Sequence, residues 1–587
     1  MRTKIVLFRS IALLIGLLLG LVLTEGILRK LWGSPQEDLL KKDTANPCYY
    51  YFYFDCYRDF FRKVKTPAGE TLCVSQRNEA GRKLFAVVPK ESFPLKKPPG
   101  TRRIFILGES TACYFGDSKN ELITVLKKRI PGPKFEVINC GMPGYDIIRT
   151  FRVLKEVMNY SPDLVLLFMG NNVLVDPDFV MNNPIRRFLY EKTWCYRLLD
   201  RNFLKNHCVH YPQGYSFGMH EKMLKEMVQL SKAKKVPLAL YTLPCNLKAF
   251  LRFALQGPVS TREYFLARIF MDQKKLNEAG KLLKSLAEHD YGKNLGVLML
   301  LGLCMEEQGN YKLALKYARC ALQNIDFYAG ESLFNRHRKN LITSDIARRE
   351  NLPLVDLEAR FMEMAPHGLP GYDFLLDEMH WWQAFNPWIM EETLRTISEY
   401  NRDKKEKILS WTGTWNGVMA SIQNEARENA GREYSADAMT RYFQYSISYL
   451  GGKSDFIFPD TVIEYLKRVY PVNPALFKDV ATFKTQAYKM LPNSAASSEQ
   501  SGVFNEKWPS FLWAIGETLR QLGQYKKALV FFNESIRLKC DSFYPYLLRG
   551  LTYYLLKDSV KARNDWNKVI EKDPEFIWLN EVPGQRP

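Results

Sequence analysis

The sequence predicts an α/β fold in which a parallel sheet carries helices on both faces. Short apolar runs, each followed by turn residues, alternate with amphipathic helical segments between residues 101 and 400. This alternation is typical of parallel strands joined by helical crossovers. The expected strands are Ile104–Leu107, Phe135–Asn139, Asp163–Met169, Val236–Leu243 and, after a long detour, Leu352–Leu357.

The detour and the C-terminal region both predict paired helices. Residues 260–325 are expected to form two helical hairpins, with small residues where the helices approach each other. In residues 501–587, Gly516 and Gly550 stand 34 residues apart, and small and aromatic residues follow each of them in the same order. This period resembles the tetratricopeptide repeat, whose arrays bind proteins or peptides. For the inserted pair, helices that simply pack on the α/β domain remain an equal alternative.

Length and charge narrow the classes of function. A chain of 587 residues is too long for a single core and should contain two or three domains. Its net charge of +20 suits an acidic polysaccharide, an anionic lipid surface or nucleic acid, although a generally basic solvated surface is the simplest explanation. The basic residues form no compact block, so we expect no nucleic-acid partner. The 11 cysteines include no Cys-x-x-Cys pair, which argues against a zinc site or a disulfide framework.

The N-terminal segment, residues 1–32, is predicted to be an uncleaved signal-anchor helix. Its apolar stretch follows Arg2 and Lys4 and is not followed by a small-x-small cleavage site, although a cleaved signal peptide remains the alternative. The α/β domain would then face the periplasm or the cell exterior. We expect a lead-in region at 33–100, an α/β domain at 101–400 and a helical linker region at 401–500, in which Asn493–Gly502 has the composition of a linker.

Polar residues that can carry chemistry follow the predicted strands. Gly108-Glu109-Ser110 ends the first strand, Gly141 lies after the second, and Gly170-Asn171-Asn172 follows the third. Asp377 and His380 come after the fifth strand, spaced so that one short turn delivers both side chains. Each signal alone fits an ordinary cap or loop. Together they supply a nucleophile, a base, a carboxylate and backbone or amide donors, which are the groups that acyl transfer requires.

These four blocks resemble those of the SGNH (GDSL-type) hydrolases, and more narrowly of bacterial membrane-anchored members that carry tetratricopeptide repeats. The matching residues are Gly108-Glu109-Ser110, Gly141, Gly170-x-Asn172 and Asp377-x-x-His380. The resemblance implies an SGNH-type sheet with Ser110 as nucleophile, His380 as general base and Asp377 as its orienting partner. It also implies an oxyanion hole made by the backbone N–H groups of Ser110 and Gly141 and the side-chain amide of Asn172. It implies no cofactor and no metal.

The chain departs from the family pattern at several positions. Glu109 replaces the usual aspartate, and Val173 replaces an acidic residue that often follows the third-block asparagine. Trp381 and Trp382 follow the histidine and could line a pocket, although packing is favoured. Cys113 and Cys140 lie near the site in sequence and are expected to be buried packing residues. The Gly-x-Ser-x-Gly elbow of α/β-hydrolases is absent.

The sequence therefore predicts a serine ester hydrolase that acts on acyl esters, with O-acetyl groups of an envelope or extracellular glycan as a plausible substrate. An O-acyltransferase that uses a sugar hydroxyl as acceptor is one alternative. A scaffold of an envelope complex, in which the repeats bind the partner, is another. The expected partners are an acylated small molecule or glycan, a protein bound by the repeats, and the membrane through the N-terminal helix.

Overall fold

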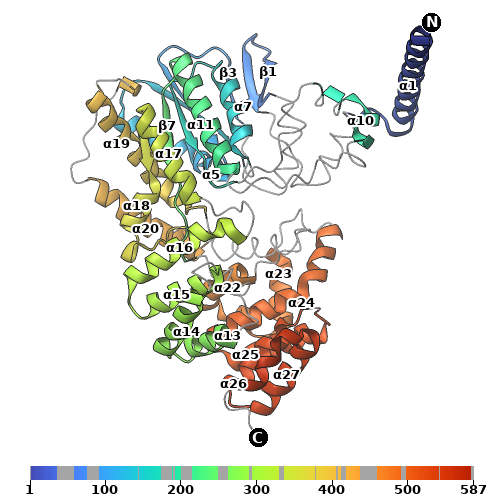
Figure 1. Ribbon diagram of the computed structural model, residues 1–587. Coiled ribbons are helices and arrows are strands. Elements are labelled where there is room, and N and C mark those ends of the chain that lie inside the picture. Colours follow the sequence, from blue (N-terminus) through green and yellow to red (C-terminus); the bar gives the residue numbers. More distant parts are fainter. Residues whose placement is uncertain are drawn as a thin grey trace. The chain divides into compact units, whose positions relative to one another are not determined.

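The structure is a computed structural model in which the chain divides into two compact units (Figure 1). Unit 1 comprises residues 1–243, 331–356 and 389–415, and unit 2 comprises residues 244–330, 357–388 and 416–587. The α/β region expected at 101–400 is thus shared between them. The structure describes residues 2–35, 59–75, 91–142, 145–172, 185, 188–189, 192–199, 215–248, 262–289, 294–328, 336–376, 379–404, 408–410, 418–436, 459–490, 498–540 and 542–582.

Unit 1 contains a five-stranded, entirely parallel sheet. Its order is β5-β4-β6-β7-β8, so β4 is flanked by the strands that follow it in the chain. All five expected strands are present, and the predicted parallel arrangement is confirmed. Their bounds are β4 (Thr101–Gly108), β5 (Lys134–Gly141), β6 (Leu164–Phe168), β7 (Leu238–Thr242) and β8 (Leu354–Asp356).

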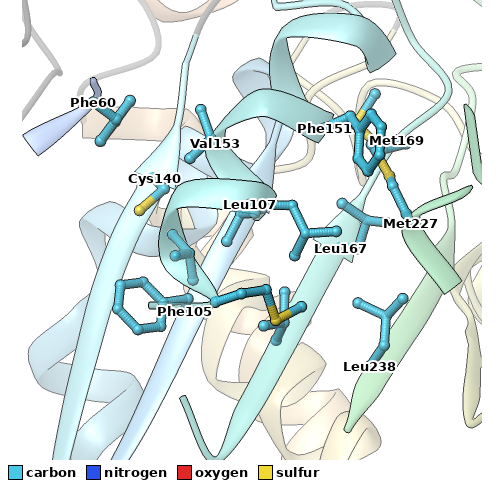
Figure 2. Close-up of a cluster of buried hydrophobic side chains, with 14 of the residues drawn as sticks. Phe60, Phe105, Leu107, Cys140, Phe151, Val153, Leu167, Met169, Met227 and Leu238 are labelled. Atoms are coloured by element: carbon cyan, nitrogen blue, oxygen red, sulfur yellow. The ribbon is translucent and has the colours of Figure 1, made fainter. Parts of the chain in front are cut away.

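Helices cover both faces of this sheet. One face packs on α7 (Ile147–Val157), α11 (Tyr215–Lys234) and α17 (Arg336–Glu350) through a continuous buried cluster. Figure 2 shows part of that cluster, in which Phe105, Leu107 and Leu167 of the strands appear with Val153 of α7 and Met227 of α11. The opposite face meets α5 (Ser110–Asp117), α6 (Lys119–Arg129) and α19 (Asn386–Lys404).

Two contacts show how the second face is closed. Phe115 of α5 packs against Phe168 of β6 with ring centroids 5.0 Å apart. The hydroxyl groups of Tyr241 on β7 and Thr393 on α19 lie 2.8 Å apart in a buried hydrogen bond. Because both faces are covered, the strands contain continuous apolar runs, as a doubly covered parallel sheet requires, such as Ile104–Leu107 of β4 and all five residues of β6.

A small antiparallel sheet precedes the parallel one and was not predicted. It consists of β1 (Phe61–Lys65), β2 (Thr71–Ser75) and β3 (Ser92–Pro94) in that order. The Glu156 carboxylate of α7 accepts the backbone N–H of Phe61 at 3.0 Å and the Tyr160 hydroxyl at 2.7 Å. The sheet is therefore fixed to α7 by a hydrogen bond from the backbone of β1 to the Glu156 side chain. Only Phe61 of the five residues of β1 is buried, so the strand has no alternating apolar pattern.

The N-terminal residues form the helix α1 (Arg2–Trp32). Within the part of the chain that the structure describes, no helix combines the length and the apolar character that crossing a membrane requires. The predicted transmembrane helix is therefore not supported by the structure.

Unit 2 is built mainly from helices. Two hairpins occupy the insertion, and two more lie near the C-terminus. The insertion contains α13 (Arg262–Asp272), α14 (Leu276–His289), α15 (Leu295–Glu307) and α16 (Tyr311–Tyr328). The C-terminal region contains α24 (Ser498–Gln521), α25 (Tyr525–Arg537), α26 (Tyr544–Leu555) and α27 (Ser559–Lys572).

The remaining described elements of the chain are α10 (Trp194–Leu199), α18 (Leu357–Met364), α20 (Val418–Ala436), α22 (Pro459–Val472), α23 (Val480–Met490) and the short 3-10 helices η3 (Pro366–Gly368), η4 (Gln383–Phe385), η5 (Ile408–Ser410), η6 (Pro474–Phe477) and η7 (Pro574–Glu581).

The same turn closes each of these four hairpins. Lys274, Gly309, Gly523 and Lys557 all have a positive φ, between 60° and 75°. In each case the N–H of the next residue donates to the carbonyl five positions earlier, at 2.7–2.9 Å. This is the hydrogen-bond pattern of a left-handed helix C-cap. The four hairpins therefore share one local design, and their assignment as tetratricopeptide repeats stays a prediction.

The inserted hairpins pack on the C-terminal ones within unit 2. Arg520 of α24 is almost fully buried and pairs at 2.6 Å with both Glu517 of its own helix and Asp272 of α13. Phe265 of α13 meets Trp566 of α27 edge-on, with ring centroids 6.0 Å apart. Segments far apart in the sequence therefore form one helical body.

The interpretation of Asn493–Gly502 as a linker is wrong for its second half. Ser498 begins α24, which continues for 24 residues. Residues 491–497 lie outside the described residues. A stretch rich in serine and alanine is compatible with either a linker or a helix, and here the helix extends back into it.

Replacing Gly550 by alanine should destabilise unit 2. A Cβ at this position would lie 2.5 Å from Nε1 of Trp566, which is buried and hydrogen-bonded to the Leu547 carbonyl. Overpacking of this kind costs about 1–3 kcal/mol. The measurement is the urea midpoint of the unfolding transition. Gly431→Ala in α20 is the matched control, because nothing lies within 4 Å of its Cβ, and equal midpoints for the two variants would contradict the packing argument.

Candidate active site

The predicted nucleophile lies at the point where the sheet reverses its strand order. From β4 the chain moves to β5 on one side, and it then returns to β6 on the other side of β4. Ligands of open α/β sheets bind in the crevice at the carboxyl ends of such neighbouring strands. Ser110 directly follows β4, and Gly170-Asn171-Asn172 follows β6. The first and third predicted blocks therefore meet at this edge.

Ser110 is the first residue of α5, and Glu109 is the extended residue before it. Gly108 makes this sharp change possible, because its φ is +142° and a Cβ there would lie 2.0 Å from the Phe168 carbonyl oxygen of β6. No side chain fits at that distance. Ser110 is a buried residue at the N-terminus of α5, where the helix dipole favours negative charge.

Glu109, the residue before the predicted nucleophile, binds the turn after β6. Its side chain is fully buried, and its carboxylate accepts the backbone N–H groups of Gly170, Asn171 and Asn172, each at 2.8 Å. Sequence reasoning treated Glu109 only as a tolerable replacement for aspartate and missed this function. The sequence shows an acidic residue beside the predicted nucleophile, but it does not show that this residue binds the backbone of Gly170, Asn171 and Asn172.

The environment of Glu109 contains opposing influences on its ionisation. Burial raises the pKa of the carboxyl, whereas the backbone N–H donors and the cations Lys339 and Arg336 of α17 oppose that rise. Burial also lowers the pKa of His220 on α11 to about 3, with a further contribution from Lys339, so this histidine is neutral. The nearby imidazole thus adds no positive charge to the site.

Asn172 is held on three sides. Besides the bond from its N–H to Glu109, its side-chain Nδ2 donates to the Tyr145 carbonyl at 2.8 Å, and its own carbonyl accepts from Lys339 Nζ at 2.7 Å. An amide nitrogen carries two hydrogens, so one donor remains beyond the bond to Tyr145. Asn172 is half-buried and can be reached from solvent, whereas Asn171 is fully buried.

Gly141 ends β5 in register with Gly108 of β4. Its N–H donates to Oδ1 of Asn139 at 2.9 Å, so this hydrogen bond already uses the donor that was predicted to face an oxyanion. A Cβ on Gly141 would lie 2.2 Å from the backbone nitrogen of Cys113 in α5. The observed reason for glycine here is therefore the close approach of the strand to α5, and a donor role would require the N–H to leave Asn139.

His380 lies in unit 2, in a hairpin-like turn. Leu375 and Trp381 form an antiparallel bridge, and the Leu376 N–H donates to the His380 carbonyl at 2.7 Å. Asp377 lies outside the described residues. The indole N–H of Trp382 donates to the Tyr372 carbonyl at 2.8 Å.

Trp381 is anchored in the same way as Trp382. Its indole N–H donates to Oδ1 of Asn386 at 2.7 Å, and both indoles are at most 4% exposed. The two tryptophans pack, as favoured, and hold the turn that carries His380. Cys113 and Cys140 are buried core residues, as expected.

Among the predicted site residues, the structure thus brings Ser110, Gly141 and Asn172 together at one sheet edge in unit 1. His380 is described with unit 2, and the Ser-His-Asp arrangement stays a prediction.

Comparisons with known proteins give only weak similarity. No family model matches the chain, and no curated protein matches it. Among solved structures, the chain is similar to a GDSL-like lipase from Bacteroides thetaiotaomicron, with 12% identity over 51% of this chain and 89% of that chain and a TM-score of 0.24. It is also similar to an acetyl xylan esterase, with 12% identity over 50% and 98% of the two chains and a TM-score of 0.25. Scores this low carry no argument.

Glu109→Gln should destabilise the protein and change its pH dependence. The substitution replaces an acceptor oxygen by an amide that faces N–H donors, which costs roughly 1–3 kcal/mol. Because burial raises the native pKa of Glu109 above 4.5, the native state holds this proton more readily than the unfolded chain, and the free energy of unfolding falls as pH rises between the two pKa values. The variant lacks this fall.

The measurement is a series of urea midpoints from pH 4 to pH 8 for the wild type and the variant. Glu70→Gln is the control, because this exposed glutamate lies in the turn between β1 and β2. A Glu109→Gln protein with the stability and the pH profile of the control would contradict the role assigned to this carboxylate.

Proposed function

We propose that the protein is a serine ester hydrolase in which Ser110 is the nucleophile. One observation carries the proposal: the residue before this serine binds the turn that presents the Asn172 amide. Glu109 fixes the N–H of Asn172 at 2.8 Å, and Ser110 follows Glu109 directly at the start of α5. Ser110 and Asn172 thereby follow adjacent strand ends at a topological switch point. This supports the proposal, because acyl transfer requires a nucleophile and a hydrogen-bond donor close to each other.

In the proposed mechanism, Ser110 Oγ attacks the ester carbonyl carbon while His380 removes the hydroxyl proton and Asp377 orients the imidazole. Negative charge develops on the carbonyl oxygen. The Ser110 N–H and the second hydrogen of Asn172 Nδ2 stabilise it. His380 then gives the proton to the leaving alcohol, and the acyl group remains on Ser110. Water, deprotonated by His380, attacks the acyl-enzyme and releases the acid, which restores the serine.

The substrate we propose is an O-acylated glycan or a small acyl ester, in keeping with the net charge of +20. Location in the periplasm or at the cell exterior, and a protein partner at the helical hairpins, are further proposals that rest on the sequence. Gly141 is left out of the proposed donors because its N–H is bonded to Asn139.

Ser110→Ala should abolish both labelling by a fluorophosphonate probe and hydrolysis of short-chain aryl acetates, because the variant loses the proposed nucleophile. The hydroxyl of the next residue, Thr111, lies 3.4 Å from Nδ2 of the buried Asn171. The measurement uses purified full-length protein. Ser118→Ala, at the far end of the same helix, is the matched control and should keep both activities. If the folded wild type neither labels nor turns over, the proposed function is wrong.

Asn172→Ala should lower kcat on the order of a hundredfold or more, because the variant loses an oxyanion donor. Asn171→Ala should lower kcat less than about tenfold, since the Asn171 side chain is buried and its Nδ2 lies 3.4 Å from Thr111 Oγ1. Steady-state kinetics on the same aryl acetate separates the two variants. A larger loss of kcat in Asn171→Ala than in Asn172→Ala would contradict the assignment of Asn172 as the oxyanion donor.

A further inference from the structure

α17 brings two polar side chains to the carboxyl edge of the sheet. Asn340 accepts the Leu243 N–H at 2.9 Å and donates to the Leu243 carbonyl at 2.9 Å, so it binds the residue that follows β7. Lys339, the residue before it, donates to the Asn172 carbonyl at 2.7 Å after β6. One helix thus binds the chain just beyond two neighbouring strands of the sheet.

The burial of Lys339 requires a compensating interaction. Its side chain is 3% exposed, and a buried ammonium group is costly unless it is paired and hydrogen-bonded. The buried Glu109 carboxylate is attached to the same turn from the other side. Glu109 accepts the N–H of Asn172, and Lys339 donates to the carbonyl of Asn172. Opposite charges therefore bind the two backbone groups of one residue, each in the direction that its dipole favours.

We propose that Lys339 is a positioning residue for the oxyanion donor, because its ammonium group holds the Asn172 carbonyl while Glu109 holds the Asn172 N–H. The inference rests on the proposed ester hydrolysis. Lys339 touches no reacting atom in this role. It acts through Asn172, whose side-chain amide keeps its direction toward the crevice only while the backbone of that residue is fixed.

The charged and titratable groups around Glu109 determine what loss of Lys339 would do. Among the described residues they include the cations Lys339 and Arg336 on α17, with His220 of α11 beside Lys339 and neutral. Removing Lys339 takes away one of these positive charges, so the pKa of Glu109 rises further. A protonated Glu109 loses acceptor capacity for the three N–H groups of the turn. As the pH is lowered, the variant should therefore lose activity at a higher pH than the wild type does.

The test is Lys339→Met in the full-length protein, with two readouts. On a short-chain aryl acetate, kcat should fall roughly tenfold to a hundredfold with KM within twofold, as expected for a misplaced catalytic group. In a plot of kcat against pH, the decline on the acid side (the acid limb) should move to higher pH. Hydrogen–deuterium exchange of the Gly170–Asn172 amides should accelerate at least tenfold, and this second readout does not depend on activity.

Two further variants separate positioning from simple destabilisation. Lys232→Met is the matched control, because this half-exposed lysine of α11 pairs at the surface with Glu350 of α17. It should leave the acid limb and the exchange rates unchanged. Lys339→Arg keeps the positive charge and should keep the acid limb near its wild-type position, which makes the test usable if Lys339→Met does not fold.

The outcomes are distinct for the inference and for the proposed function. An unchanged acid limb and unchanged exchange of the turn in Lys339→Met would overturn the positioning role. If the wild type hydrolyses no ester, the proposed function is overturned. If amide exchange of the turn nevertheless accelerates in Lys339→Met, the role of Lys339 in fixing Asn172 is supported. A loss of kcat that is equal in Lys339→Met and Lys232→Met would also overturn the inference.

Discussion

A buried carboxylate holds the turn on which the candidate site depends. Gly170, Asn171 and Asn172 present three consecutive N–H groups after β6, and Glu109 accepts all three. An ionised carboxylate offers only acceptors, and it is therefore suited to three converging donors. Burial opposes its charge, but backbone N–H donors and the cations of α17 oppose that effect. Since Ser110 is the next residue, the same side chain links the backbone at Ser110, the proposed nucleophile, to the backbone of Asn172.

This arrangement places Ser110 and Asn172 at the ends of the two central strands β4 and β6 of the sheet in unit 1. Ser110 and Asn172 follow adjacent central strands, and their neighbours Gly108 and Phe168 approach so closely that only glycine fits at position 108. Electrostatic stabilisation of an oxyanion depends on donors that do not have to reorganise. The predicted base, His380, belongs to a separate turn in unit 2 that is fixed by two buried indoles.

Sequence patterns were sufficient for the parallel sheet and insufficient for the elements around it. Its five strands were predicted because apolar runs bounded by turn residues are a local signal. The sheet formed by β1, β2 and β3 was missed because β1, Phe-Arg-Lys-Val-Lys, is short and buries little beyond Phe61. The start of α24 was placed too late because a serine- and alanine-rich stretch fits both a linker and a helix. Glu109 was noticed, but its triple acceptor role was not.

The sequence by itself determined where strands end, where Ser110 begins a helix, and the 34-residue spacing of Gly516 and Gly550, because caps, turns and periods are encoded by neighbouring residues. Only the tertiary structure decided which groups meet. Lys339 reaches Asn172 across 167 positions, and Arg520 pairs with Asp272 across 248. Such contacts depend on which helix and strand faces pack against each other, and a local sequence pattern does not determine this.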